Sequence, residues 1–210
     1  LEADLEYCSK NGISIARRFT GGGAVYHDTG NLNFAICANQ KESYVARTLP
    51  ELYSDFVGNI AFGLSKIGIE ASYDEYRSCI RIGNRKITGT AGWIKRGVSF
   101  IHGTLLIDTD LEKLTLALSP PAGQTRYLRD EKRIRCKESY RDIVTCIRRS
   151  GLIEISDVEI EAAVIESIEN YTKESLVIGD LTSKEREVAD SLYQSRYSRS
   201  TWNLGTPIPE

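Results

Sequence analysis

The spacing of apolar residues predicts a long core helix in the first third of the chain. Between residues 43 and 68 apolar side chains recur at helical intervals, and Gly68 supplies a stop signal. Because proline interrupts helical hydrogen bonding, we expect this helix to bend, or to begin anew, near Pro50. The apolar positions are Val45, Leu49, Leu52, Phe56, Ile60, Leu64 and Ile67.

Strands are predicted on both sides of this helix, where apolar residues alternate with polar ones or form short runs. Residues 98–108 have the most strongly apolar pattern, so we expect them at the centre of a sheet. Alternation places Leu32, Phe34 and Ile36 on one face of another strand. The Gly83-Asn84 pair predicts a hairpin turn. The expected strands are residues 13–19, 31–38, 69–73, 78–82, 86–87, 98–108 and 176–178.

The remaining helices are predicted from their end signals. Two capping boxes, in which Ser or Thr precedes Glu by three positions, begin helices that run to about residues 172 and 197. Residues 1–10 and 110–118 predict shorter helices, and residues 143–147 a short helix or strand. The capping boxes are Ser156 with Glu159 and Thr182 with Glu185.

Composition narrows the class of protein. The chain has 210 residues, 41% hydrophobic and 27% charged, which suits one globular domain. A net charge of −2 argues against an electrostatically driven nucleic-acid binder, and no apolar run is long enough to span a membrane. The five scattered cysteines predict neither a disulfide framework nor a zinc site, which favours a reducing cytoplasm. They are Cys8, Cys37, Cys79, Cys136 and Cys146.

The first candidate site is the run RRFTGGGAVYHDTGNLNF at residues 17–34. Three consecutive glycines lack Cβ atoms and allow positive φ, so backbone N–H groups can turn together toward an anion. Arg17 and Arg18 add planar forks for phosphate or carboxylate oxygens. The alternative is a glycine-rich hairpin with solvated arginines. The adjacent His27 and Asp28 suit a structural hydrogen-bonding pair better than an acid-base couple, and we expect His27 to bind ligand, not to transfer protons.

The second candidate site lies at residues 83–111, where Lys86 precedes the small residues Thr-Gly-Thr-Ala-Gly. A lysine beside a bend of small residues can reach a carboxylate and a phosphate together, whereas most lysines are only solvated. Thr88 and Thr90 offer hydroxyl donors, although strand packing explains them equally well. We interpret four nearby cations as surface charges that could meet an acidic partner domain. These are Arg81, Arg85, Lys95 and Arg96.

Together the two runs resemble the lipoate-protein ligase A family, within the biotin and lipoate ligase superfamily. The first run matches the family pattern at Arg17, Arg18, Gly21, Gly22, Gly23, Val25, His27, Asp28, Gly30 and Asn31. The second matches it at Lys86, Gly89 and Ala91 and again from His102 to Leu106. Trp202, Asn203 and Gly205 are similar to the family's closing motif.

The resemblance implies an α+β domain over residues 1–210, with a mixed sheet flanked by helices as in class II synthetase-like cores. It also implies that ATP and Mg²⁺ activate lipoate to lipoyl-adenylate, and that Lys86 stabilises the charge that builds on the phosphoryl oxygens. No protein ligand for the metal is identified. The implied ATP and lipoyl-adenylate contacts are Arg17, Arg18, Gly22, Gly23, Ala24, Val25, His27, Asp28, Asn31, Lys86, Gly89, Thr90 and Ala91.

The implied acceptors are lysines on the lipoyl domains of 2-oxoacid dehydrogenase complexes and on the glycine cleavage H protein. The chain begins at Leu1 and contains no methionine, so we expect that an N-terminal segment is missing. The family's C-terminal accessory domain is also absent from the sequence, and we expect a separate protein to supply it, as in an archaeal arrangement. Two alternatives stay open. One is an octanoyl or lipoyl transferase that forms a thioester on Cys79, and the other is a lipoate-binding subunit that is inactive without its partner.

Overall fold

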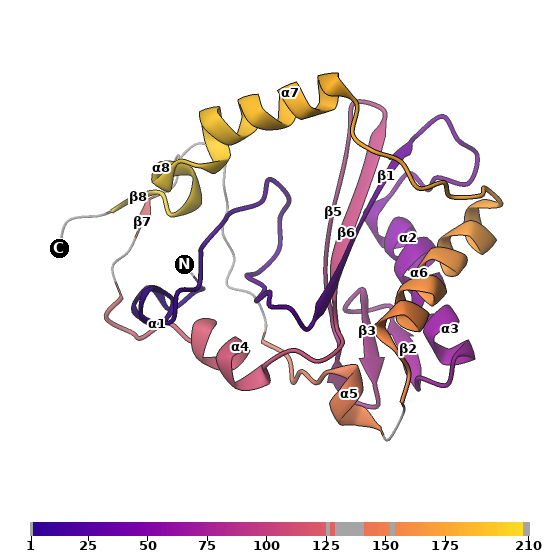
Figure 1. Ribbon diagram of the computed structural model, residues 1–210, viewed down its shortest axis with the longest axis horizontal. Helices are drawn as coiled ribbons and strands as arrows, with labels where there is room; N and C mark the ends of the chain where they lie inside the picture. Colours follow the sequence, from indigo (N-terminus) through magenta and orange to yellow (C-terminus); the bar gives the residue numbers. More distant parts are fainter. Residues whose placement is uncertain (1, 125–126, 129–140, 152–153, 208–210) are drawn as a thin grey trace. The chain divides into compact units, whose positions relative to one another are not determined.

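The computed structural model describes residues 2–124, 127–128, 141–151 and 154–207 (Figure 1). The chain forms two compact units, and each is assembled from separate stretches of sequence. The larger unit takes residues 20–111 and 140–176, and the smaller unit takes residues 1–19, 112–139 and 177–210. The sheets β1-β6-β5 and β2-β3-β4 and the helices that cover them lie in the larger unit.

The main sheet of the larger unit has the order β1-β6-β5 and is antiparallel throughout. It consists of β1 (Asn31–Asn39), β6 (Val98–Leu106) and β5 (Thr88–Lys95). The strand predicted at residues 98–108 is therefore central, as expected. In β1 the side chains of Leu32, Phe34 and Ile36 pack on the core while the residues between them are exposed, as the alternation predicted.

A second sheet of short strands has the order β2-β3-β4, with β2 at Ala71–Asp74, β3 at Cys79–Ile82 and β4 at Arg85–Lys86. The predicted hairpin turn joins β3 to β4, and Gly83 has a φ of 57° there. An isolated parallel bridge between Lys86 and Val144 adds a further pairing at β4. Hydrogen bonds from Ile87 N to Ile80 O and from Leu106 N to Ile87 O connect the two sheets.

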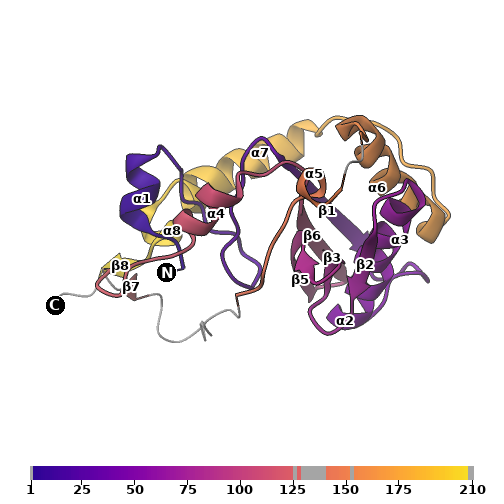
Figure 2. The ribbon, with the colours of Figure 1, turned by 90° about the horizontal axis from the view of Figure 1, so that it is seen from below.

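One long helical segment supplies several fully buried side chains of the apolar core. It runs through α2 (Leu49–Leu52), a π-helical stretch at Tyr53–Gly58 and α3 (Asn59–Lys66). The helix begins at Leu49 with Pro50 in its first turn, where the missing proline N–H costs no helical bond. Helix α6 (Asp157–Thr172) lies beside α3 in both ribbon views (Figures 1 and 2). Between the sheets and these helices the buried side chains form one cluster, which includes Leu52, Phe56, Ile60, Leu64, Ile80, Ile101, Leu105 and Ile160.

The smaller unit is mainly helical. Its elements are α1 (Leu5–Lys10), most of α4 (Leu111–Ala117), α7 (Ser183–Leu192), a π-helical turn (Tyr193–Tyr197), α8 (Ser200–Asn203) and the strand pair β7 (Tyr127–Leu128) and β8 (Thr206–Pro207). Both predicted capping boxes are present, at the starts of α6 and α7. A hydrogen bond of 2.8 Å from Asp4 N to Ala117 O ties α1 to the end of α4.

Three predictions of secondary structure are wrong. Residues 13–19 and 176–178 are not strands, and the small residues after Lys86 form strand β5 instead of a bend. The α+β class and most predicted elements are confirmed. Cys136 and Leu1 lie outside the described residues.

Candidate functional site

A closed corner precedes β1, built from the predicted Asp-x-Gly-Asn residues. Asp28 accepts hydrogen bonds from the backbone N–H of Gly30 (2.9 Å) and of Asp110 (2.9 Å), and Asn31 Oδ1 accepts one from Asp28 N (2.8 Å). Gly30 O in turn accepts from Ile107 N. A Cβ on Gly30 would stand 2.4 Å from the carbonyl carbon of Asp108, so only glycine fits there. The corner is thus held firmly against the end of β6.

Not every donor of this corner is used within the protein. Asn31 Nδ2 is buried and has no hydrogen-bond partner among the described residues. A buried amide donor without a partner is costly unless something else accepts its hydrogen bond. Asn31 is therefore suited to bind a polar ligand group, whereas the carboxylate of Asp28 is occupied by backbone N–H groups. His27, next to Asp28, is exposed.

The glycine run at residues 20–25 lies on the main sheet and is fixed at both ends. Thr20 Oγ1 and His102 Nε2 share a hydrogen bond of 2.7 Å, which ties the start of the run to β6. At the other end Val25 lies against Gly89 of β5, because a Cβ on Gly89 would be only 2.8 Å from Val25 Cγ1. Gly22, between these ends, is exposed and has a φ of 93°. The two sequence motifs therefore meet on one sheet.

Lys86 lies where the chain passes from the small sheet to the main sheet. Its backbone N–H donates to Ile143 O (2.8 Å), and its carbonyl accepts from Thr145 N (3.0 Å). The side chain is half-buried and forms no ion pair with any described residue. A half-buried ammonium without a carboxylate partner is available to an anionic ligand.

The small residues after Lys86 have structural contacts of their own. Thr88 Oγ1 accepts from Ile80 N (2.8 Å), and Thr90 Oγ1 donates to Ser78 O (2.6 Å), so both hydroxyls hold β5 to the β3 region. Gly89 N donates to Thr104 Oγ1 (3.2 Å), and Ala91 is buried. The packing explanation of the two threonines is the one that these contacts favour.

Arg17 and Arg18 belong to the smaller unit and lie in irregular chain. Arg17 donates through its backbone N–H to Asn203 Oδ1 (3.0 Å) and through Nε to Asn203 O (3.0 Å). Trp202 Nε1 donates to Arg17 O (2.8 Å). The closing Trp-Asn motif therefore holds Arg17 at the start of the first motif, a connection across 185 residues that sequence spacing did not reveal.

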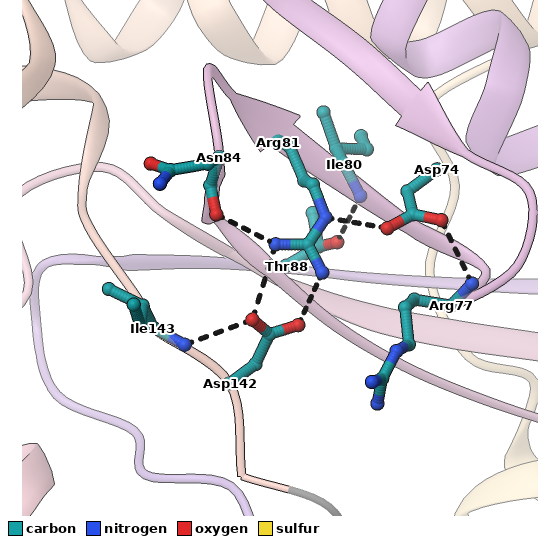
Figure 3. A network of polar contacts seen from close by, with 8 residues as sticks. All are labelled: Asp74, Arg77, Ile80, Arg81, Asn84, Thr88, Asp142 and Ile143. Atoms are coloured by element: carbon teal, nitrogen blue, oxygen red, sulfur yellow. Dashed lines mark hydrogen bonds and ion pairs between the residues drawn. The ribbon is translucent and has the colours of Figure 1, made fainter.

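Arg81 is not a surface charge, which corrects the sequence prediction. Its guanidinium donates to Asp74 Oδ2 (2.6 Å), to Asn84 O (3.0 Å) and to both oxygens of Asp142 (Figure 3). Only 15% of the Arg81 side chain is exposed. The hydrogen bond from Arg81 lowers the pKa of Asp74. Asp142 also has a lowered pKa, because its bonds to Arg81 and the charges of Arg81 and Lys86 outweigh the opposing effect of burial.

The thiol of Cys79 is fully buried in β3. Burial raises its pKa, and the nearby charges of Lys86 and Arg81 offset this only in part. A nucleophilic cysteine needs an accessible thiolate with a lowered pKa. Cys79 meets neither condition, because its thiol is buried and its pKa is raised.

The part of the chain that the structure describes has neither a cluster of metal-binding side chains nor a membrane-spanning helix. There, no group of three or more His, Cys, Asp or Glu side chains could hold a metal ion. No helix among the described residues is long and apolar enough to cross a bilayer.

Comparison with known proteins gives the family. The model of the lipoyl protein ligase A/B catalytic domain matches residues 1–169. The chain belongs to this family. Lipoate-protein ligase A subunit 1 of Thermoplasma acidophilum is 30% identical over 97% of this chain and 76% of its own length. Lipoate-protein ligase LplJ of Bacillus subtilis is 30% identical, but the chain spans only 58% of it. Octanoyltransferase LipM of Kyrpidia tusciae is 26% identical over 96% of the chain and 78% of the relative.

Solved structures agree with this membership. A lipoate-protein ligase A bound with ATP has a TM-score of 0.80 and 28% identity, over 97% of this chain and 77% of that one. A T. acidophilum protein with bound lipoic acid has a TM-score of 0.78 and 27% identity over the same shares. A bi-partite lipoate protein ligase of T. acidophilum, described together with its E2 lipoyl domain, also has a TM-score of 0.78, with 29% identity over 100% of this chain and 77% of that one. The predicted family and fold are confirmed, and a ligase or transferase role follows from the family.

Proposed function

We propose that this chain is the catalytic domain of a lipoate-protein ligase, which forms lipoyl-adenylate from lipoate and ATP and passes the lipoyl group to a lysine of an acceptor domain. The observation that carries the proposal is the half-buried Lys86, whose ammonium has no carboxylate partner among the described residues, directly before the place where β5 meets the glycine run. Homologous proteins with bound ATP and with bound lipoic acid support the choice of substrates.

In the first step the lipoate carboxylate attacks the α-phosphorus of ATP and pyrophosphate leaves. Both reactants are anions, so Lys86 would bring them together and stabilise the charge that builds on the phosphoryl oxygens. The exposed backbone around Gly22 and the buried Asn31 Nδ2 are proposed as further anion and polar contacts, and the implied contacts of Arg17 and Arg18 stay predictions. The implied contacts Gly23, Ala24, Val25, His27, Asp28, Gly89, Thr90 and Ala91 stay predictions.

In the second step the acceptor lysine attacks the mixed anhydride. The carbonyl oxygen gains negative charge beside Lys86, and AMP leaves. No nucleophile of this chain is required. Mg²⁺ would enter with the ATP phosphates, which supply ligands that do not come from the protein, and we assign no step to it.

The acceptors are proposed to be lipoyl domains of 2-oxoacid dehydrogenase complexes and the glycine cleavage H protein. A separate accessory protein is proposed as well, because one structural relative is a bi-partite ligase. If that protein is required for turnover, the chain alone would be the inactive lipoate-binding subunit.

The second candidate function is a transferase, because octanoyltransferases are among the relatives. A thioester on Cys79 is disfavoured by the complete burial and the raised pKa of that thiol. The ligase is therefore the better-supported reading.

Lipoate-dependent exchange between ATP and pyrophosphate tests the proposal. Wild type, Lys86→Ala and the control Lys95→Ala, which removes an exposed lysine at the end of β5, are compared with and without a candidate accessory protein. We expect exchange to fall by about 10² or more in Lys86→Ala, the scale of losing a main electrostatic stabiliser, and to persist in Lys95→Ala. Absence of exchange in wild type under every condition, with acyl transfer that Cys79→Ser abolishes, would replace the ligase by a transferase.

A further inference from the structure

Arg81 and Lys86 form an unusual pair of like charges. They are directly opposite in the antiparallel pairing of β3 with β4, so their side chains leave the same face of the small sheet. Like charges in this arrangement repel each other unless anions lie between or beside them. Asp74 and Asp142 supply those anions, yet both carboxylates bind Arg81, and neither forms an ion pair with Lys86.

Asp142 is the carboxylate that could pair with either cation. Both of its oxygens accept from the Arg81 guanidinium (Figure 3). The positive charge of Lys86 contributes to its lowered pKa, so Lys86 is within electrostatic reach of Asp142. The chain after Asp142 also runs beside Lys86, since Lys86 N donates to Ile143 O and Thr145 N donates to Lys86 O.

We propose that Arg81 is a positioning residue that keeps Asp142 away from Lys86, so that the Lys86 ammonium stays available to an anionic substrate. The planar fork of arginine binds both carboxylate oxygens at once, which a lysine ammonium cannot do. Asp142 therefore stays with Arg81 although a second cation lies close by. Asp74 accepts from Nε of the guanidinium, and Asn84 O accepts from Nη1, which also donates to Asp142 Oδ1, so the orientation of the guanidinium is fixed.

If Arg81 keeps Asp142 away from Lys86, replacing Arg81 and replacing Asp142 should have different effects on activity. Removal of Arg81 frees Asp142 to pair with Lys86 and neutralise it, whereas removal of the Asp142 charge leaves Lys86 free. A purely structural ion pair would behave differently, since each single change breaks the same contact. A measurement of pyrophosphate exchange rests on the proposed function of Lys86. A measurement of how fast the Lys86 amine reacts with a labelling reagent does not.

The experiment compares Arg81→Gln, Asp142→Asn, the double variant, and the control Arg85→Gln, which changes an exposed arginine on the neighbouring position of β4. We expect kcat of pyrophosphate exchange to fall in Arg81→Gln by about tenfold or more, up to the roughly 10²-fold loss of removing Lys86 itself. Asp142→Asn, the double variant and Arg85→Gln should stay within about threefold of wild type, because none of them gives Lys86 a carboxylate partner and an exposed charge such as Arg85 contributes little.

Trace labelling of Lys86 with acetic anhydride, read by peptide mass spectrometry, gives the independent measurement. An ammonium paired with a carboxylate gives up its proton less readily, so labelling of Lys86 should fall about two- to fivefold in Arg81→Gln and return in the double variant. Thermal unfolding of each variant identifies any that fails to fold.

Equal losses in the two single variants with no recovery in the double, or unchanged labelling in Arg81→Gln, would overturn the role of Arg81. If wild type shows no exchange at all, the proposed function fails, while the order of labelling among the variants still decides whether Arg81 protects Lys86.

Discussion

Val25 lies against the bare backbone of Gly89, so that a methyl group at the Cβ position of Gly89 would be 2.8 Å from Val25 Cγ1. The two residues belong to motifs that are 64 positions apart in the sequence. Their contact explains why a run of small residues follows Lys86. The small side chains in β5 let the glycine run lie directly on the strand, which brings its backbone close to the strand that follows the lysine.

Gly89→Ala should therefore disturb substrate binding more than folding. The added methyl group pushes against Val25 and also lies 3.3 Å from Thr104 Oγ1, so the glycine run must move outward. Overpacking of this kind costs about 1–3 kcal/mol. We expect KM for ATP and lipoate in pyrophosphate exchange to rise several-fold. Gly179→Ala, where the methyl group meets no atom within 4 Å, is the control, and equal KM values for the two variants would refute the prediction.

Gly30→Ala should instead destabilise the fold. Its Cβ would lie 2.4 Å from the backbone of Asp108, and backbone cannot move aside as a flexible side chain can. We expect the free energy of unfolding in urea to fall by at least about 1–3 kcal/mol. Gly21→Ala places its methyl group in open space and should change stability by no more than about 0.5 kcal/mol. Similar urea midpoints for Gly30→Ala and Gly21→Ala would show that the backbone around Gly30 can move to accommodate a methyl group.

The cysteines should differ sharply in reactivity. Cys37 is exposed on β1, whereas Cys8, Cys79 and Cys146 are buried, and burial raises the pKa of Cys8 and Cys79. Because the thiolate is the reactive form, N-ethylmaleimide at neutral pH should label Cys37 much faster than Cys79 in the folded protein. Peptide mass spectrometry over a time course measures this. Labelling of Cys79 at the rate of Cys37 would reopen the thioester mechanism, and so would loss of acyl transfer in Cys79→Ser.

Acid should weaken the Arg81 network. The folded-state pKa values of Asp74 and Asp142 lie below the ordinary value of 3.8, so their contribution to stability is present above that value. It is lost as the pH falls through the lowered folded-state values. We expect urea midpoints of wild type to drop from about pH 5 toward pH 2, and those of Arg81→Gln to drop less over the same range. Parallel curves for the two proteins would show that the network does not contribute to acid stability.

Local signals in the sequence predicted the elements that depend on local chemistry. The two capping boxes are formed because each Ser or Thr and the Glu three positions later satisfy each other's backbone groups. The apolar pattern of residues 98–108 predicted a central strand, and β6 at Val98–Leu106 does lie between β1 and β5. Such signals need no knowledge of distant residues.

Predictions failed where a distant residue decides the outcome. Residues 13–19 alternate like a strand, yet Arg17 bonds to Asn203 instead of to a neighbouring strand. The small residues after Lys86 pair with β6 along their whole length, so they extend where their composition suggested a bend. The sequence alone suggested a solvated charge at Arg81, because its partner Asp142 is 61 positions away. The two carboxylates of that network could not be assigned without the structure.

The bond between Arg17 and Asn203 joins two residues that are made far apart in time during synthesis. The larger unit ends at residue 176, while the smaller unit needs its first nineteen residues and its last thirty-four, 177–210, at the same time. Because synthesis runs from the N-terminus, the two sheets of the larger unit can form before residues 202 and 203 leave the ribosome. Arg17 can form its hydrogen bonds with Trp202 and Asn203 only after these two residues have left the ribosome. Translation therefore delays the docking of Arg17 until Trp202 and Asn203 have been made.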